Sequence, residues 1–218
     1  MKFQFTLTGI SPLLMHADNV ENSDMLAAWR KAPENKSLKV AGDDRSPPWS
    51  WQTYLITDNT NLCLSVDMLS AALRQAGSML TLGKRGTMKS VSQSGLFLEP
   101  DFMSLTVGDK PISVQSINDI RDLTFAEQSA AVQDLGFSLF VKRATVGSAK
   151  HVRVRARFDE WQVSGTVETL MKELDETSVR DLFRLAGQYK GLGDWRPSAP
   201  KSPGRFGRFT AELKKIAA

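Results

Sequence analysis

The chain has 218 residues, of which 41% are hydrophobic and 24% charged, and its 28 Lys and Arg exceed its 24 Asp and Glu by a net charge of +4. These proportions are those of an ordinary folded globular protein, and the length suits one domain with insertions. The single cysteine, Cys63, excludes an intramolecular disulfide, and together with only two histidines it argues against a Cys/His zinc site.

The first predicted strand covers residues 2–10, where Phe3, Phe5 and Leu7 alternate with polar residues as in a half-buried strand. Ser11-Pro12 ends it. We expect residues 13–64 to form a long irregular insertion, with a short helix over 25–30 and a short strand or two around 50–56. Insertions of this length tend to be functional or mobile.

A helix is predicted from Ser65, a suitable N-cap, to Gly83. Its apolar positions recur at helical spacing: Val66, Leu69, Leu73, Ala76 and Leu80. A basic, polar segment follows over residues 84–95. Short strands are then expected over residues 96–98, 104–107 and 112–114, and a short helix over residues 124–135.

Residues 137–146 and 151–158 predict the two strands of a hairpin. In the second strand, apolar residues alternate with His151, Arg153, Arg155 and Arg157. Three arginines about 7 Å apart on one strand face repel each other unless an anion lies there. Arginine suits phosphate through its planar fork. The alternative is a solvated outer face, since charged residues protect sheet edges from aggregation.

A third strand is predicted over residues 161–170, then a helix over 178–189 that Gly191 ends, and a last strand over 205–213. Between this helix and the last strand lies a basic segment that contains several glycines. Gly193, Gly204 and Gly207 allow close approach of a partner to the backbone, or a positive φ. Cations and flat apolar rings beside bare backbone are what single-stranded nucleic acid needs from a protein. The alternative is a turn-rich loop whose charges face water.

This order of elements predicts an α+β fold with a ferredoxin-like (RRM-type) β-α-β-β-α-β core and long insertions. We expect one domain over residues 1–218, with the irregular insertion at about residues 13–64. Such a sheet carries helices on one face and leaves the other free to meet RNA or DNA.

Two segments resemble those of the RAMP superfamily. The early strand followed by Ser11-Pro-Leu-Leu-Met-His16 is similar to the opening of its members, and Gly191-Leu-Gly193 with Gly204-Arg-Phe-Gly207-Arg-Phe209 is similar to their glycine-rich loop. The superfamily includes the Cas7-like backbone subunits and Cas6-like RNA processors of CRISPR systems. The arginine-bearing strand before Phe158-Asp-Glu-Trp161, and Gly193-Asp-Trp-Arg-Pro197, also resemble uncharacterised bacteriophage and prophage proteins.

The resemblance implies a ferredoxin-like core, binding to single-stranded nucleic acid and, for Cas7-like members, side-by-side assembly along the strand. Three prolines make the segment over residues 191–209 stiffer than a loop of glycine and lysine alone. No run of about 20 apolar residues predicts a membrane span, and no signal-peptide pattern opens the chain. We therefore expect a protein of the bacterial host cytoplasm that forms a homo-oligomer or filament and does not enter the membrane.

The sequence thus predicts a sequence-independent protein that binds single-stranded DNA or RNA, without catalysis, metal or cofactor. The expected nucleic-acid-binding residues are Lys84, Arg85, Lys89, Lys142, Arg143, Arg153, Arg155, Arg157, Trp195, Arg196, Lys201, Arg205 and Phe206. The cations would meet phosphates, and Trp195 and Phe206 would stack on bases. Reversing the charge of Arg153 and Arg155 is expected to abolish binding and leave the fold intact.

Two other functions stay open. The first is a metal-independent, Cas6-like endoribonuclease with His16 as general acid or base and Tyr54 or Lys84 as helper. The second is a viral inhibitor that mimics a CRISPR subunit and binds protein. Five acidic residues in the insertion match no known metal-binding loop, and we expect them on the solvated surface: Asp18, Glu21, Asp24, Asp43 and Asp44.

Overall fold

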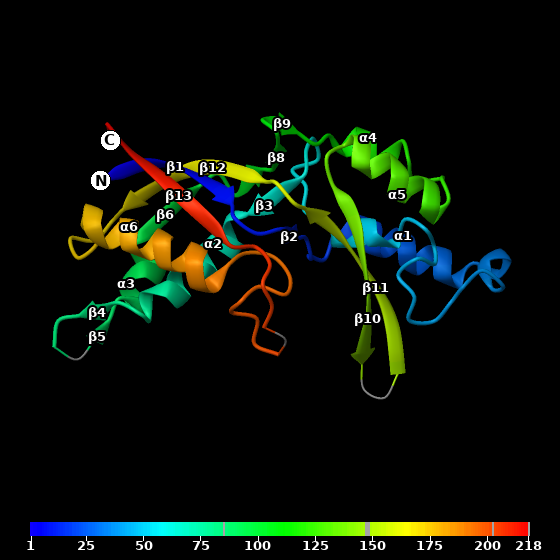
Figure 1. Ribbon diagram of the computed structural model, residues 1–218, viewed down its shortest axis with the longest axis horizontal. Coiled ribbons are helices and arrows are strands. Elements are labelled where there is room, and N and C mark those ends of the chain that lie inside the picture. Colours follow the sequence, from blue (N-terminus) through cyan, green and yellow to red (C-terminus); the bar gives the residue numbers. More distant parts are fainter. Residues whose placement is uncertain (85, 147–148, 202, 218) are drawn as a thin grey trace. The chain divides into compact units, whose positions relative to one another are not determined.

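The computed structural model describes residues 1–84, 86–146, 149–201 and 203–217, and its contacts divide the chain into two compact units. Unit 1 comprises Met1–Leu13, Cys63–Pro111 and Asp159–Ala218, and unit 2 comprises Leu14–Leu62 and Ile112–Phe158. Both combine helices with antiparallel strands, so the predicted α+β class is confirmed (Figure 1).

The main sheet of unit 1 is built around its first strand. Strand β1 (Lys2–Gly9) lies between β13 (Phe209–Ile216) and β12 (Gln162–Thr169). On the other side of β12, β6 (Leu96–Glu99) pairs along its second half. These pairs are all antiparallel, in the order β13-β1-β12-β6.

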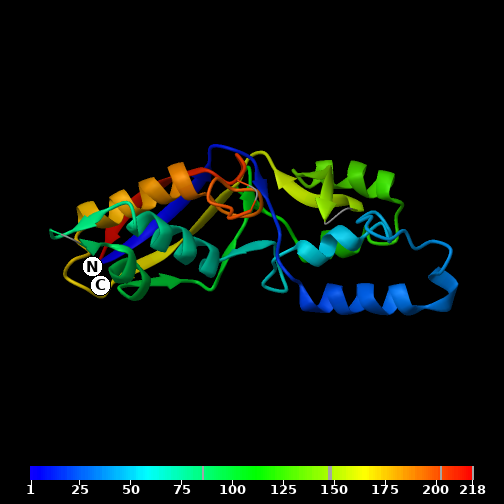
Figure 2. The same ribbon diagram turned by 90° about the horizontal axis from the view of Figure 1, so that it is seen from below.

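Two helices cover one face of this sheet (Figures 1 and 2). Helix α2 (Val66–Gly77) begins at its predicted cap, where the Ser65 hydroxyl accepts a hydrogen bond from the Asp67 N–H at 3.2 Å. Helix α6 (Glu176–Leu185) continues into a π-helical turn, η3 (Ala186–Lys190), and ends at Gly191, whose φ is +68°. Phe5 of β1 is fully buried, with its ring centroid 5.3 Å from that of Phe183. The apolar residues that alternate along β1 therefore point into the core, and the polar residues between them lie on the open face of the sheet, as predicted.

Smaller elements complete unit 1. A hairpin of β4 (Thr81–Leu82) and β5 (Gly86–Thr87) leads into α3 (Lys89–Ser94), and β3 (Cys63–Ser65) pairs with β7 (Phe102–Ser104). The remaining strands, β8 (Thr106–Val107) and β9 (Lys110–Pro111), extend the main sheet beside β12.

Unit 2 holds a long hairpin and several helices. Strands β10 (Ser138–Val146) and β11 (Ala149–Phe158) form the predicted hairpin, and β2 (Leu13–Leu14) pairs with β11. The helices are α1 (Val20–Lys31), η1 (Pro33–Asn35), η2 (Ser50–Tyr54), α4 (Val114–Asn118) and α5 (Phe125–Asp134). In the core of this unit the Trp51 indole N–H donates to the Gln128 side-chain oxygen at 2.7 Å.

Several predicted elements differ from the structure. Residues 14–62 are not irregular, because they contain α1, η1 and η2 and form one compact unit with residues 112–158. The strand expected around residues 50–56 is a 3₁₀ helix whose consecutive residues are buried. The strand expected over 112–114 is instead the capped start of α4, where the Ser113 hydroxyl accepts from the Gln115 N–H. The helix expected to reach Gly83 ends at Gly77, and the last strand begins at Phe209.

Candidate nucleic-acid interface

The glycine-rich loop (residues 191–208) of unit 1 folds back on itself. Gly193 and Gly207 have φ values of +73° and +71°, which only glycine adopts readily. A Cβ on Gly204 would collide with the Trp195 carbonyl oxygen, and a Cβ on Gly207 with that of Leu192. The close approach that these glycines permit is thus between two segments of the loop itself, and no partner is needed to explain them.

The end of this loop is bound to the turn that follows β1. The Gly207 N–H donates to the Pro12 carbonyl at 2.8 Å, and the Arg208 N–H donates to the Ser11 hydroxyl at 2.9 Å. The Trp161 indole N–H donates to the Ser11 carbonyl at 2.9 Å. The two segments that carry the resemblance, Ser11-Pro12 and the glycine-rich loop, therefore lie in direct contact although they are far apart in sequence.

The side chains of the loop divide into internal and exposed ones. The Arg196 guanidinium donates to the Gly193 carbonyl at 3.0 Å and to the Ser198 hydroxyl at 3.2 Å, so this residue partly closes the loop. Phe206 is only 9% exposed, so the prediction that it stacks on bases is wrong for the structure as it stands. Lys201 and Arg205 are exposed, as predicted for residues that meet phosphates.

Trp195 has an unusual backbone. It is half-buried and has a φ of +45°, a conformation that costs a bulky residue about 1–3 kcal/mol and that clusters at functional sites. Its carbonyl accepts the Phe206 N–H at 3.3 Å. The loop therefore holds a partly exposed indole in a strained position beside its exposed cations.

Further predicted cations of unit 1 lie around the β4–β5 hairpin. Lys84 is exposed in the turn of this hairpin, and Lys89 is exposed at the start of α3. Arg85 lies outside the described residues.

In unit 2, the predicted arginine face of β11 exists. The register sets Phe140 opposite Arg155 and Lys142 opposite Arg153, so these four side chains share one face of the hairpin. On the other face, Val154 is fully buried, as predicted. Lys142 and Arg143 are exposed, and Arg157 is half-buried with its guanidinium 6.0 Å from the Phe140 ring centroid.

The anion that the clustered arginines require is Asp44 of the same unit. One Asp44 carboxylate oxygen lies 3.0 Å from Arg153 Nη1, and the other lies 3.3 Å from Arg155 Nη1. The same carboxylate accepts the Val154 N–H at 3.2 Å. Asp44 is 3% exposed, so the expectation that it lies on the solvated surface is wrong, and Arg155, which is 6% exposed, is buried against Asp44 and does not present its guanidinium to a phosphate as predicted. The sequence carries no signal for this pairing, since the partners are more than a hundred residues apart.

This ion cluster changes how the arginines can be tested. Reversing the charge of Arg153 and Arg155 would place two new carboxylates beside the buried carboxylate of Asp44, three like charges in all, and unpaired buried charges are strongly destabilising. We therefore expect this double reversal to disrupt the fold of unit 2, contrary to the expectation from the sequence.

The ion cluster adjoins the candidate general acid. The Arg155 guanidinium lies 4.0 Å above the Tyr54 ring, and the His16 ring centroid is 5.0 Å from that of Tyr54. His16 is exposed and Tyr54 half-buried. An imidazole, a phenol and a guanidinium are groups that can move protons and stabilise charge at a phosphodiester without a metal.

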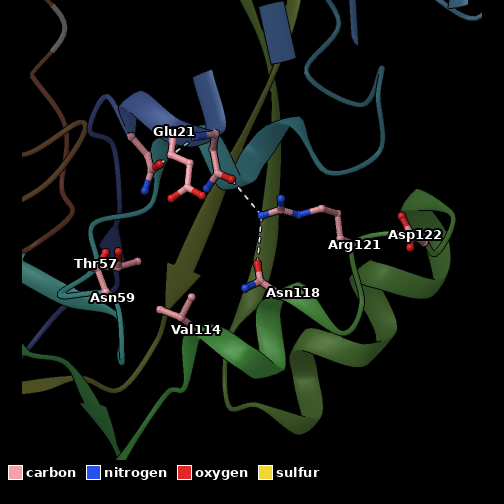
Figure 3. A pocket seen from close by; sticks show the side chains of 9 residues that line it. Glu21, Thr57, Asn59, Val114, Asn118, Arg121 and Asp122 are labelled. Atoms are coloured by element: carbon pink, nitrogen blue, oxygen red, sulfur yellow. Dashed lines mark hydrogen bonds between the residues drawn. The ribbon is translucent and has the colours of Figure 1, made fainter. Parts of the chain in front are cut away.

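A polar pocket of about 350 Å³ in unit 2 was not foreseen (Figure 3). Arg121 occupies one side, and its guanidinium donates to the side-chain oxygens of Gln52, Asn22 and Asn118 at 2.9, 2.9 and 3.0 Å. Burial lowers the pKa of Arg121, while nearby Glu21 and Asp122 oppose this shift. Because its acceptors come from α1, η2 and α4, Arg121 cross-links these helices, and nothing in its sequence context marks it.

The described residues contain no cluster of His, Cys, Asp or Glu that could hold a metal ion. Among the same residues, every helix is too short or too polar to cross a bilayer. No known protein-family model matches the sequence, and no curated protein matches it.

Proposed function

We propose that this protein binds single-stranded nucleic acid without regard to base order and assembles side by side along the strand. The observation that carries the proposal is the charge of the glycine-rich loop and its edge. Residues 190–208 contain five Lys or Arg and a single acidic residue, Asp194. Lys201, Arg205 and Arg208 among them are exposed. A row of exposed cations on a fixed loop, beside a partly exposed indole, suits a phosphate backbone and its bases.

The strand order supports a ferredoxin-like core for unit 1. Taking β1, β6, β12 and β13 as the strands of a β-α-β-β-α-β unit, with α2 and α6 as its helices, the sheet order is fourth-first-third-second, all antiparallel. We propose on this ground, and on the two contacting segments of the resemblance, one domain of the RAMP superfamily in which unit 2 is formed by insertions.

The residues on the open face of the sheet support the glycine-rich loop, and not the sheet itself, as the main contact with nucleic acid. The exposed residues of the two central strands are polar and small, such as Gln4, Thr8 and Ser164. RNA-binding sheets of the RRM type stack bases on aromatic residues at such positions. The two central strands therefore offer hydrogen bonds without stacking, and Phe97, which is 51% exposed, lies on the short strand β6 beside them, so we assign stacking to Trp195 of the loop.

The test is fluorescence anisotropy with labelled single-stranded DNA, single-stranded RNA and duplex, with the products run on a denaturing gel. Lys201→Glu/Arg205→Glu should abolish binding, whereas Lys172→Glu, an exposed cation before α6, should leave it unchanged. Intact oligonucleotide is expected in every lane. Absence of binding to all probes would refute the proposal and favour an inhibitor that binds protein.

One observation supports a second candidate, a metal-independent ribonuclease. His16 and Tyr54 lie in contact, and Arg155 packs on Tyr54. In this case single-stranded RNA would be cleaved in the presence of EDTA, and His16→Ala would bind RNA but not cut it. Uncut RNA after prolonged incubation with the wild-type protein would exclude this candidate.

A further inference from the structure

The outermost strand of unit 1 has an open edge. Strand β13 is the end of the sheet order, and the described part of the chain places no strand on its other side. Its inner side faces β1, where the Ile10 N–H donates to the Arg208 carbonyl at 2.9 Å, whereas the Gly9 N–H points to the opposite side of β1 and donates to the Trp161 carbonyl beside β12, also at 2.9 Å. Since backbone groups alternate in direction along a strand, Ala211, Leu213 and Lys215 direct theirs to the open edge.

A groove runs along this edge. It has a volume of about 460 Å³ and is bounded by β13 and α6. Its apolar lining includes Phe209, Ala211 and Leu213 of the strand, and Ile10, which is 59% exposed. Unpaired strand edges with apolar residues alongside are templates for another strand.

We propose that β13 pairs with β13 of a second copy of this chain, antiparallel, about a two-fold axis at Leu213. The two main sheets then join into one across the dimer. In this register Leu213 lies opposite its own copy, and Ala211 lies opposite Lys215 of the second copy, whose aliphatic stem fits over the small residue. Both pairs consist of residues whose backbone groups face the open edge, as hydrogen-bonded antiparallel pairs require.

The charges of the strand select this register. With the axis at Leu213, Glu212 of each copy lies directly opposite Lys214 of the other, on the face away from the helices. Moving the axis by one residue sets Glu212 against Glu212, or Lys214 against Lys214. Opposite charges directly across an antiparallel pair stabilise it and like charges destabilise it. The strand is thus complementary to itself in one register and repulsive in the two adjacent ones.

Lysines on an edge strand also protect against pairing with other chains. Here Lys214 has that effect toward any partner strand that lacks an acidic residue at the matching position. A second copy of β13 has one, so the same residue that excludes foreign strands favours the dimer. The inference depends on β13 alone and on none of the proposed nucleic-acid contacts.

Sedimentation velocity from about 1 to about 100 µM protein, without nucleic acid, tests the dimer. The wild-type chain should dimerise within this range. Glu212→Lys and Lys214→Glu should each raise the dissociation constant by about tenfold or more, because two symmetry-related pairs turn from attractive to repulsive. The double charge swap E212K/K214E should restore the dimer. The adjacent exposed residues Lys172 and Glu173 give matched controls, K172E and E173K, which should change nothing. A wild-type monomer at the highest concentration, or a charge swap that fails to restore the dimer, would overturn the proposal.

Cysteine cross-linking tests the register even if a charge variant fails to fold. Glu212→Cys and Lys214→Cys chains are prepared separately and mixed under oxidation. Non-hydrogen-bonded antiparallel partners lie about 4.5 Å apart at Cα, within reach of a disulfide. The mixture should form a cross-linked dimer, and neither chain alone should do so, since Cys63 is buried. Equal cross-linking of each chain by itself would contradict the register.

Discussion

The buried carboxylate of Asp44 should dominate the stability of unit 2. Asp44→Asn keeps the shape of the side chain but removes the negative charge that lies 3.3 Å from Arg155 Nη1, and Arg155 is only 6% exposed. Removing one partner of a buried ion pair costs about 3–5 kcal/mol. The Tyr54 ring under the Arg155 guanidinium remains in the variant, so the cation is not left wholly uncompensated and the lower end of this range applies. We therefore expect Asp44→Asn to lower the free energy of unfolding by about 3 kcal/mol.

The neighbouring residue provides the control. Asp43 is paired with Arg45, whose side chain is 47% exposed, so Asp43→Asn should cost no more than about 1 kcal/mol. Urea unfolding followed by circular dichroism measures both variants against the wild type. Equal losses for Asp43→Asn and Asp44→Asn, or a loss below about 1 kcal/mol for Asp44→Asn, would refute the assignment of Asp44 as the counter-ion of the cluster.

Three further predictions concern acid stability, the glycine-rich loop and the β10–β11 hairpin. Hydrogen bonds from the Thr124 hydroxyl and amide hold the pKa of Glu127 below its ordinary value of 4.5. The ionised Glu127 carboxylate therefore stabilises the fold at pH values above 4.5, and this stabilisation is lost as the pH falls through the lowered pKa. The melting temperatures of wild type and Glu127→Gln should therefore converge from about pH 6 to about pH 3, and a constant difference would contradict this. Gly207→Ala should destabilise the chain more than Gly83→Ala by thermal unfolding, because both have positive φ but only Gly207 would place a Cβ against a carbonyl; equal losses would count against the packing of the loop. Lys142→Glu/Arg143→Glu, both exposed, should leave the melting temperature within a few degrees of wild type, whereas R153E/R155E should prevent folding.

Local periodicity predicted most of unit 1. Strand β1 alternates because one of its faces is buried against α2 and α6 while the other is open. The cap of α2 was predicted for the same local reason, as Ser65 accepts a hydrogen bond from its own first turn, whereas the capping box of Thr124 and Glu127 at the start of α5 was not predicted.

The first part of unit 2, residues 14–62, was predicted as irregular apart from the helix over residues 25–30, because its elements lack a strong pattern. Helix α1 buries only Leu26, so its sequence shows no apolar stripe. In η2 the residues Trp51, Gln52 and Thr53 are buried in succession, which matches the period of neither a strand nor an α-helix. The compact unit depends on contacts between segments far apart in the chain, such as that of Trp51 with Gln128.

The candidate interface was predicted in part. Lys201 and Arg205 are exposed as expected, since a loop rich in Gly and Pro directs charged side chains outward. Phe206 and Arg155 are buried, because an aromatic ring and an arginine stem also satisfy internal packing. Residue type alone does not distinguish an exposed cation such as Lys201 from Arg196, which donates hydrogen bonds within the loop, or from Arg155, which pairs with the distant Asp44.

The most direct test of the central claim is the salt dependence of single-strand binding, measured by anisotropy. With about three phosphates neutralised by the exposed cations of the loop, the logarithm of the binding constant should fall with the logarithm of salt concentration at a slope of about −2. In Lys201→Glu/Arg205→Glu the binding should be lost, and Lys172→Glu should reproduce the wild-type slope. Binding that is absent, insensitive to salt, or equally weakened in Lys172→Glu would contradict the account.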